Sequence, residues 1–178
     1  FLLKNNAPCS YALFEAVETN DIEMVDIVLK YKNKPSFINK KSLRGTALLI
    51  AVSKNNLPIV KRLLSLPGID ASLYCTRNET PFIKAINDLN IEMVDQFISF
   101  YGENILKQKW QIDTIINDIL KFNKNENSDQ QTKKKSAILT RLLEARCIDI
   151  NYHFYYYTLL TYACKANDID FVKYLLQY

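Results

Sequence analysis

The chain has 178 residues, of which 48 % are hydrophobic and 24 % are charged, and its formal net charge is +4. These values are ordinary for a globular protein with a continuous core, and the charge is too mild by itself to indicate a nucleic-acid partner. Only three glycines and five prolines are present, which argues against β-sandwiches and doubly wound sheets because those folds need many tight turns. No apolar run approaches the roughly 18–20 residues of a membrane-spanning helix, so no membrane span is expected.

The stretch from Gly45 to Ser72 recurs along the chain. A step of 34 residues relates Thr46 to Thr80, Ala51 to Ala85, Asn56 to Asn90 and Val60 to Val94. Equivalent residues occur 35 positions earlier, between Ala16 and Leu29, and 112 positions later, between Thr158 and Leu176. A period in the low thirties indicates a solenoid. The predicted fold is all-α: stacked antiparallel helix pairs with short hairpin-like fingers, in a single domain over residues 1–178.

The first half of the chain is predicted to hold a partial repeat, 1–9, and three regular repeats, 10–44, 45–78 and 79–108. In repeat 10–44, apolar residues at helical spacing predict helices over Tyr11–Glu18 and Ile22–Tyr31. Leu63 and Leu64 are expected in the shared core. An Asn or Asp precedes each second helix, and these residues are predicted to adopt the left-handed conformation of the turn, which Asn and Asp tolerate best after glycine. They are Asp21, Asn56, Asn90 and Asp168.

The second half is less regular. Residues 109–156 form an irregular repeat, in which isoleucines and a leucine between Ile112 and Leu120 predict a first helix. The polar stretch 123–135 is predicted to be a mobile insertion, with the second helix starting at Ser136. Whether the insertion is functional or a product of neutral drift stays open. Residues 157–178 form a last, incomplete repeat, so the chain is expected to be a piece of a longer array.

Three helix starts carry the motif on which a family resemblance depends: Thr46-Ala47-Leu48-Leu49, Thr80-Pro81-Phe82-Ile83 and Thr158-Leu159-Leu160-Thr161. Exit segments such as Ile69-Asp70-Ala71-Ser72 and Ile148-Asp149-Ile150-Asn151 complete the pattern. With these motifs the chain resembles the ankyrin-repeat family, in divergent form: the His of that family's helix start is absent, and Asn or Asp replaces its turn glycine. The resemblance implies an elongated, curved stack whose fingers and short inner helices form a concave surface where partner proteins dock.

No pattern of chemistry-bearing residues indicates catalysis. The four cysteines, Cys9, Cys75, Cys147 and Cys164, lack the paired spacing of a zinc site, and the chain has one histidine. Three glycines cannot form a phosphate-binding loop. We therefore expect no enzyme activity, no metal and no cofactor. Free thiols are typical of a reducing compartment, so we expect an intracellular protein, cytoplasmic or nuclear.

Two segments stand out as candidate contact sites. Between Lys30 and Arg44 the chain carries six cations and no acidic residue, which suits a phosphate or an acidic partner but is more typical of a solvated finger whose charges are screened. Tyr152–Tyr157 is an unbroken run of ring-bearing residues. Alternate side chains of a hairpin face opposite ways, so some rings must face solvent or a partner. The alternative is that half of the rings pack on the neighbouring finger and the others have no role in binding. The candidate partner-binding residues are Lys41, Arg44, Tyr74, Arg77, Tyr152, His153, Phe154 and Tyr156.

Three functional hypotheses follow. The first is a scaffold that binds another protein on its concave surface. The second is a targeting or regulatory arm of a larger enzyme, channel or effector, in which the partner includes other domains of the same longer chain. The third is binding of nucleic acid or anionic lipid through the basic fingers, which predicts a steep dependence of affinity on salt.

Overall fold

The computed structural model describes residues 11–74, 79–102, 116, 119–120, 129–154 and 157–178. Ten helices and two small two-stranded sheets lie within these residues, so the expected all-α character is confirmed in its main feature. The chain divides into two compact units, Phe1–Ala85 and Ile86–Tyr178. One domain over residues 1–178 stays a prediction.

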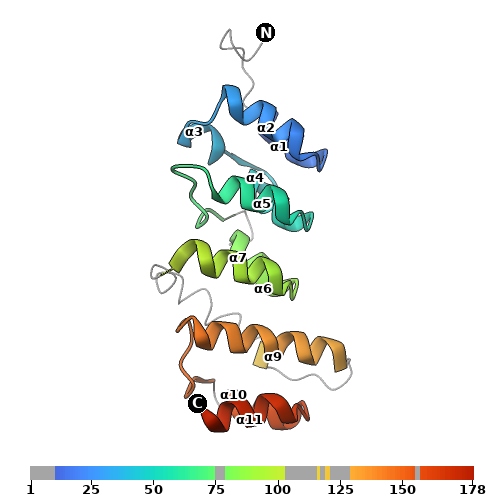
Figure 1. The fold of residues 1–178 in the computed structure, drawn as a ribbon, viewed down its shortest axis with the longest axis vertical. Helices are drawn as coiled ribbons and strands as arrows, with labels where there is room; N and C mark the ends of the chain where they lie inside the picture. The colour runs from blue at the N-terminus through green and yellow to red at the C-terminus, as the bar shows by residue number, and fades with distance from the viewer. Residues whose placement is uncertain (1–10, 75–78, 103–115, 117–118, 121–128, 155–156) are drawn as a thin grey trace. The chain divides into compact units, whose positions relative to one another are not determined.

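Unit 1 contains two helix pairs with a finger between them (Figure 1). The first pair is α1, Ala12–Glu18, and α2, Ile22–Tyr31. The finger comprises the short helix α3, Pro35–Ile38, and strands β1, Lys41–Ser42, and β2, Gly45–Thr46, which pair antiparallel. The second pair is α4, Ala47–Ser53, and α5, Leu57–Leu64. The first helices α1 and α4 pack together, and so do the second helices α2 and α5, so the pairs are stacked.

Unit 2 repeats parts of this plan. Helix α6, Pro81–Asn87, crosses the boundary between the units, and α7, Ile91–Tyr101, follows it. The longest helix of the described chain, α9, Asp129–Glu144, packs on α7. A second antiparallel hairpin, β3, His153–Phe154, and β4, Tyr157–Thr158, leads into α10, Leu159–Lys165, which packs on α11, Ile169–Gln177.

The turn before each second helix has the same conformation in four places, but the sequence-based assignment of its residues is wrong by one position. The left-handed residues are Asn20, Asn55, Leu89 and Asn167, with φ between 51° and 61°. The residues that follow them, Asp21, Asn56, Asn90 and Asp168, have φ between −91° and −106° and cap the second helices. Their side-chain oxygens accept hydrogen bonds from amides of the first helical turn, such as that of Ile59 on Asn56 at 2.9 Å.

Threonine starts the first helix of three pairs. The Thr46 hydroxyl accepts a hydrogen bond from the Leu49 amide at 3.2 Å, and Thr80 does the same for Ile83 at 3.3 Å. At the third start, Thr158 accepts from the amide of Thr161, and the Thr161 hydroxyl accepts from the Thr158 amide at 2.7 Å. These caps satisfy amides that lack a partner inside the helix.

The stacking of unit 1 is visible in the burial of equivalent residues. Met24 and Ile59 both lie three residues after the residue that caps their helix. Ile59 is fully buried, whereas 44 % of Met24 is exposed. The helix that carries Ile59, α5, packs on α2 of the preceding pair. This difference in burial is what a stack predicts, because each helix pair buries its apolar face against a neighbour.

Polar contacts connect successive loops of unit 1. The Asn56 amide group donates to the Asn20 side-chain oxygen at 2.7 Å, which links the two turns. In the exit loops, Asn39 donates to the Gly68 carbonyl at 2.7 Å and accepts from the Asp70 amide at 2.9 Å. The Asn39 side chain thus joins its own exit loop to the backbone of the exit loop that follows the next helix pair.

In the basic strip between Lys30 and Arg44 the structure shows a short helix that the sequence did not indicate, α3, with Pro35 at the first helical position, where proline is favoured. One further expectation needs correction. The predicted insertion 123–135 is helical from Asp129 onward, since α9 begins there and not at Ser136. The partial repeat 1–9 and most of the expected helix 112–120 lie outside the described residues. Within the latter, Ile116, Ile119 and Leu120 are buried.

None of the helices in the described part of the chain combines the length and apolarity needed to cross a membrane.

Candidate functional site

A groove of about 340 Å³ lies between the finger and the first helices of unit 1. Its floor is apolar, since Phe14 of α1 and Ile50 of α4 are both buried. Its rim is formed by the turn of the β1–β2 hairpin and by the exposed face of α1. The lining residues are Tyr11, Phe14, Glu15, Glu18, Ser42, Leu43, Arg44 and Ile50.

The hairpin turn that forms the rim is fixed by Ser42. Its hydroxyl donates to the Gly45 carbonyl at 2.9 Å and accepts from the Arg44 amide at 3.2 Å. These bonds fix the two-residue turn Leu43–Arg44, in which Leu43 is 91 % exposed. Nearly all of the apolar surface of Leu43 is therefore accessible to solvent.

Glu18, which lines the groove, forms ion pairs with two cationic side chains. Its Oε1 lies 2.6 Å from Nη1 of Arg44, and its Oε2 lies 3.0 Å from Nζ of Lys54. The contacts join α1 to the hairpin turn and to the end of α4. The Arg44 side chain is 73 % exposed, so the ion pair orients the guanidinium but contributes little to stability.

Two lysines of the finger lie over tyrosine rings. Lys40 Nζ is 4.6 Å from the ring centroid of Tyr11, and Lys41 Nζ is 4.4 Å from that of Tyr74. Such placement is attractive because the ring face is electronegative. Both tyrosines are exposed. The finger therefore presents two ammonium groups, each held by an aromatic ring.

The aromatic run forms the second candidate surface, in unit 2. His153 pairs with Thr158, and Phe154 with Tyr157, in the β3–β4 hairpin. His153 is exposed and Tyr152 half-buried, while the Tyr157 ring lies 4.3 Å from Lys165 Nζ. A groove of about 360 Å³ beside the hairpin is lined by Ile150, Asn151, His153, Thr158, Leu160 and Leu175. The predicted hairpin is confirmed, and the partner role of its rings stays a prediction.

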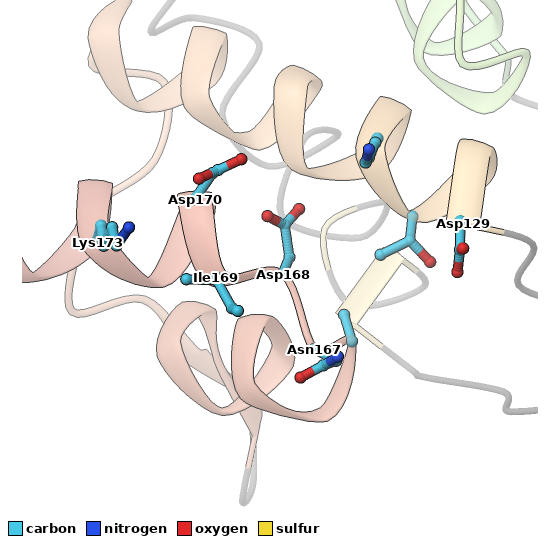
Figure 2. A pocket seen from close by; sticks show the side chains of 9 residues that line it. Asp129, Asn167, Asp168, Ile169, Asp170 and Lys173 are labelled. Atoms are coloured by element: carbon cyan, nitrogen blue, oxygen red, sulfur yellow. The ribbon is translucent and has the colours of Figure 1, made fainter.

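A third, polar cleft of about 500 Å³ lies in unit 2 between the start of α9 and the turn that joins α10 to α11. Figure 2 shows the Asp168 side chain pointing toward α9, with Asp170 and Lys173 further along α11. Three carboxylates and two ammonium groups line the cleft: Asp129, Asp168, Asp170, Lys133 and Lys173. Asp168 already accepts the Phe171 amide at 3.1 Å as a helix cap, which is a structural role.

The structure brings together three of the eight predicted contact residues in unit 1: Lys41, Arg44 and Tyr74. Tyr152, His153 and Phe154 lie in or beside the hairpin of unit 2. Arg77 and Tyr156 are outside the described residues. Sequence reasoning missed four residues that line the groove or take part in the lysine–tyrosine contacts of unit 1, namely Tyr11, Glu18, Lys40 and Leu43. Lys40 lay in the basic strip, but the tyrosine that holds it comes from a different element.

Among the described residues, no group of three or more His, Cys, Asp and Glu side chains is placed to hold a metal ion. Two of the cysteines lie in this part of the chain, and both are free thiols: Cys147 is buried and Cys164 exposed. Burial raises the pKa of the Cys147 thiol from its ordinary 9.0 to about 12, so it is protonated and unreactive at neutral pH.

We expect Cys147 to be protected from thiol reagents in the native protein. In a Cys9→Ser, Cys75→Ser variant, Ellman's reagent at neutral pH should modify Cys164 quickly and Cys147 only after denaturation. Because the folded-state pKa of Cys147 is raised, its contribution to stability is complete below about pH 9 and is lost as the pH rises toward 12. Equal modification rates of the two thiols in the native state would contradict this assignment.

Comparisons with protein-family models, with curated proteins and with solved structures found no match for this chain.

Proposed function

We propose that the chain is a divergent ankyrin-type solenoid and that it binds another protein on the surface formed by its hairpins and first helices. The repeated features support this architecture. Four turns share a left-handed residue followed by a capping Asn or Asp. Two antiparallel hairpins lead directly into a threonine-capped first helix. In unit 1 the helix pairs stack through like helices.

The groove of unit 1 is the observation that carries the functional proposal. It combines a buried apolar floor with a rim on which Leu43 is almost fully exposed. Lone exposed apolar residues are common on proteins. Here the leucine lines a groove that the exposed Tyr11 also lines, and large apolar and aromatic side chains around a pocket are typical of the hot spots of protein interfaces.

The aromatic and cationic residues fit the same role. Tyrosine and arginine are enriched at binding hot spots, since they offer a large contact area with few rotatable bonds or with directed hydrogen bonds. Tyr11, Tyr74 and Arg44 are exposed, yet each is held by a ring or ion-pair contact in the free protein. Side chains that are already oriented lose less entropy when a partner binds.

The proposed location is intracellular, in keeping with the free thiols of Cys147 and Cys164. The proposal includes no catalytic step.

Site-specific cross-linking tests the proposal. A photo-reactive amino acid is placed at Leu43, on the groove rim, in the full-length protein expressed in cells. The control places the same group at Lys61, which is exposed on the second helix α5 of the same unit. We expect a partner protein to cross-link at Leu43 and not at Lys61, and the purified partner to bind the chain directly.

Cross-linking of the partner only at Lys61 would mean that the partner binds the second helices and not the groove. Recovery of nucleic acid or lipid in place of protein at Leu43, with affinity that falls steeply as salt rises, would replace the proposal by the third hypothesis.

A further inference from the structure

The groove beside the β3–β4 hairpin of unit 2 corresponds residue by residue to a place in unit 1. The step of 112 residues that relates Thr46 to Thr158 connects each residue lining the groove to a residue of unit 1. The pairs are Ile38 and Ile150, Asn39 and Asn151, Lys41 and His153, Thr46 and Thr158, Leu48 and Leu160, and Leu63 and Leu175. The two hairpins also share one register, because Lys41 pairs with Thr46 as His153 pairs with Thr158. The same local framework therefore occurs twice.

In unit 1 this framework is covered by a loop. The loop that follows α5 lies against Asn39, whose side chain donates to the Gly68 carbonyl at 2.7 Å and accepts from the Asp70 amide at 2.9 Å. Ala71 of the same loop is buried, and Leu48 of the framework is only 1 % exposed. An extended segment of the chain thus forms backbone hydrogen bonds with the Asn39 side chain.

In unit 2 the corresponding positions are open. Leu160 is 38 % exposed, and Tyr178 is 62 % exposed although Leu66, 112 positions earlier, is buried. The Asn151 side chain is exposed and forms no hydrogen bond within the part of the chain that the structure describes. Its amide group is able to donate to one carbonyl and to accept from one N–H, as that of Asn39 does.

We propose that the groove of unit 2 is filled by the loop that continues the chain after Tyr178 in the full-length protein. By the step of 112 residues, the carbonyl of the second residue after Tyr178 accepts a hydrogen bond from Asn151, and the N–H of the fourth residue donates one to it. The fifth residue takes the position of Ala71 and is buried. This inference does not depend on the proposed function. It removes the groove of unit 2 from the partner-binding surface and leaves that of unit 1.

The fold favours the continuing chain over a loop of a separate protein. Helix α11 ends at Gln177, and Leu175 of the same helix lines the groove. A segment joined to the helix at this point is present at the groove at an effective concentration on the order of millimolar. A separate protein is more dilute, and it also loses translational and rotational freedom when it binds.

Cross-linking within the full-length protein tests the inference. A photo-reactive amino acid at Leu160, in the groove, should form an intramolecular cross-link to the residues that directly follow Tyr178, located by mass spectrometry of proteolytic fragments. The control carries the same group at Lys133, which is exposed near the start of α9 and lines the polar cleft beside the start of α11. It should not cross-link to that loop. A cross-link from Leu160 only to a separate protein, or a full-length chain with no residues after Tyr178, would overturn the inference.

Hydrogen exchange of the full-length protein tests the register of the loop. We expect the amide of the fourth residue after Tyr178 to be protected, and to exchange at least about threefold faster in Asn151→Ala. Asn151→Asp keeps an accepting oxygen and should leave that amide protected, while circular dichroism verifies that both variants are folded. Equal exchange in the unsubstituted protein and in Asn151→Ala, or a proline at that position, which has no N–H, would overturn the inference. Neither result concerns the groove of unit 1, which the cross-linking at Leu43 tests separately.

Discussion

Replacing Leu63 by alanine is expected to lower the free energy of unfolding by about 2–5 kcal/mol. Leu63 is fully buried on α5, which packs on α4 within its own pair and on α2 of the neighbouring pair. Truncation removes the burial of the leucine side chain and leaves a cavity that stacked helices cannot close without moving one another. Denaturant unfolding followed by far-ultraviolet circular dichroism measures the change.

Leu43→Ala is the control, because it makes the same chemical change in the same unit on a side chain that is 91 % exposed. It should change the stability by less than about 0.5 kcal/mol, as expected of surface substitutions. Similar losses for Leu63→Ala and Leu43→Ala would contradict the assignment of α5 to the shared core of the stack.

The sequence pattern predicted the helix pairs well where the repeat was regular. The bounds expected for α2, Ile22–Tyr31, agree with the structure, and the expected first helix differs from α1 by one residue. Two independent signals coincide there: apolar residues at helical spacing, and an Asp before the second helix. The same coincidence recurs at Asn56, Asn90 and Asp168, so the period could be followed along the chain.

The sequence analysis placed the left-handed residue of each turn one position too late, and this error has a chemical reason. Asn and Asp tolerate left-handed φ, and they also cap helix starts. In the pair Asn55-Asn56 both roles are filled by asparagine, and composition does not say which residue takes which. Leu89, at φ 51°, shows that the position before the cap adopts the left-handed conformation even where the residue is poorly suited to it.

The part of α9 that the sequence analysis missed lies in a polar and charged segment. The first two turns of α9 contain Asp, Gln, Thr and Lys and little apolar surface, so hydrophobic periodicity gave no signal. Thr132 and Ser136 are nevertheless buried there, which shows that this helix face packs through small polar side chains. Asp129 in its first turn also interacts favourably with the helix dipole.

The candidate site was predictable only in part. Lys41, Arg44 and Tyr74 were identified from their residue types and their place in the expected fingers. The contacts that orient them depend on elements far apart in sequence: Glu18 of α1 holds Arg44 of the hairpin, and Tyr74 follows the next helix pair. Spacing along one chain does not reveal such pairs.

Gly68→Ala is the second substitution expected to have a large effect. Gly68 has φ +76°, which a side chain disfavours, and an added Cβ would lie 2.7 Å from Cγ of Pro35. Pro35 is the first residue of α3 and its ring cannot rotate away. The Gly68 carbonyl also accepts the hydrogen bond from Asn39, so a displaced loop would lose that contact. We expect a loss of about 2–5 kcal/mol from backbone strain and overpacking together.

A double-mutant cycle with Pro35→Ala separates the two causes. Removing the proline ring opens the space that the new Cβ needs, so in the Pro35→Ala background Gly68→Ala should cost only the backbone strain, about 1–2 kcal/mol. Measured by denaturant unfolding, Gly68→Ala should therefore cost about 1–3 kcal/mol less in the Pro35→Ala background than in the unsubstituted protein, and this difference is the coupling energy. A coupling near zero would mean that the exit loop does not pack against α3. The finger that carries Lys40 and Lys41 would then be held to the next exit loop by the Asn39 hydrogen bonds and not by packing of Gly68 against Pro35.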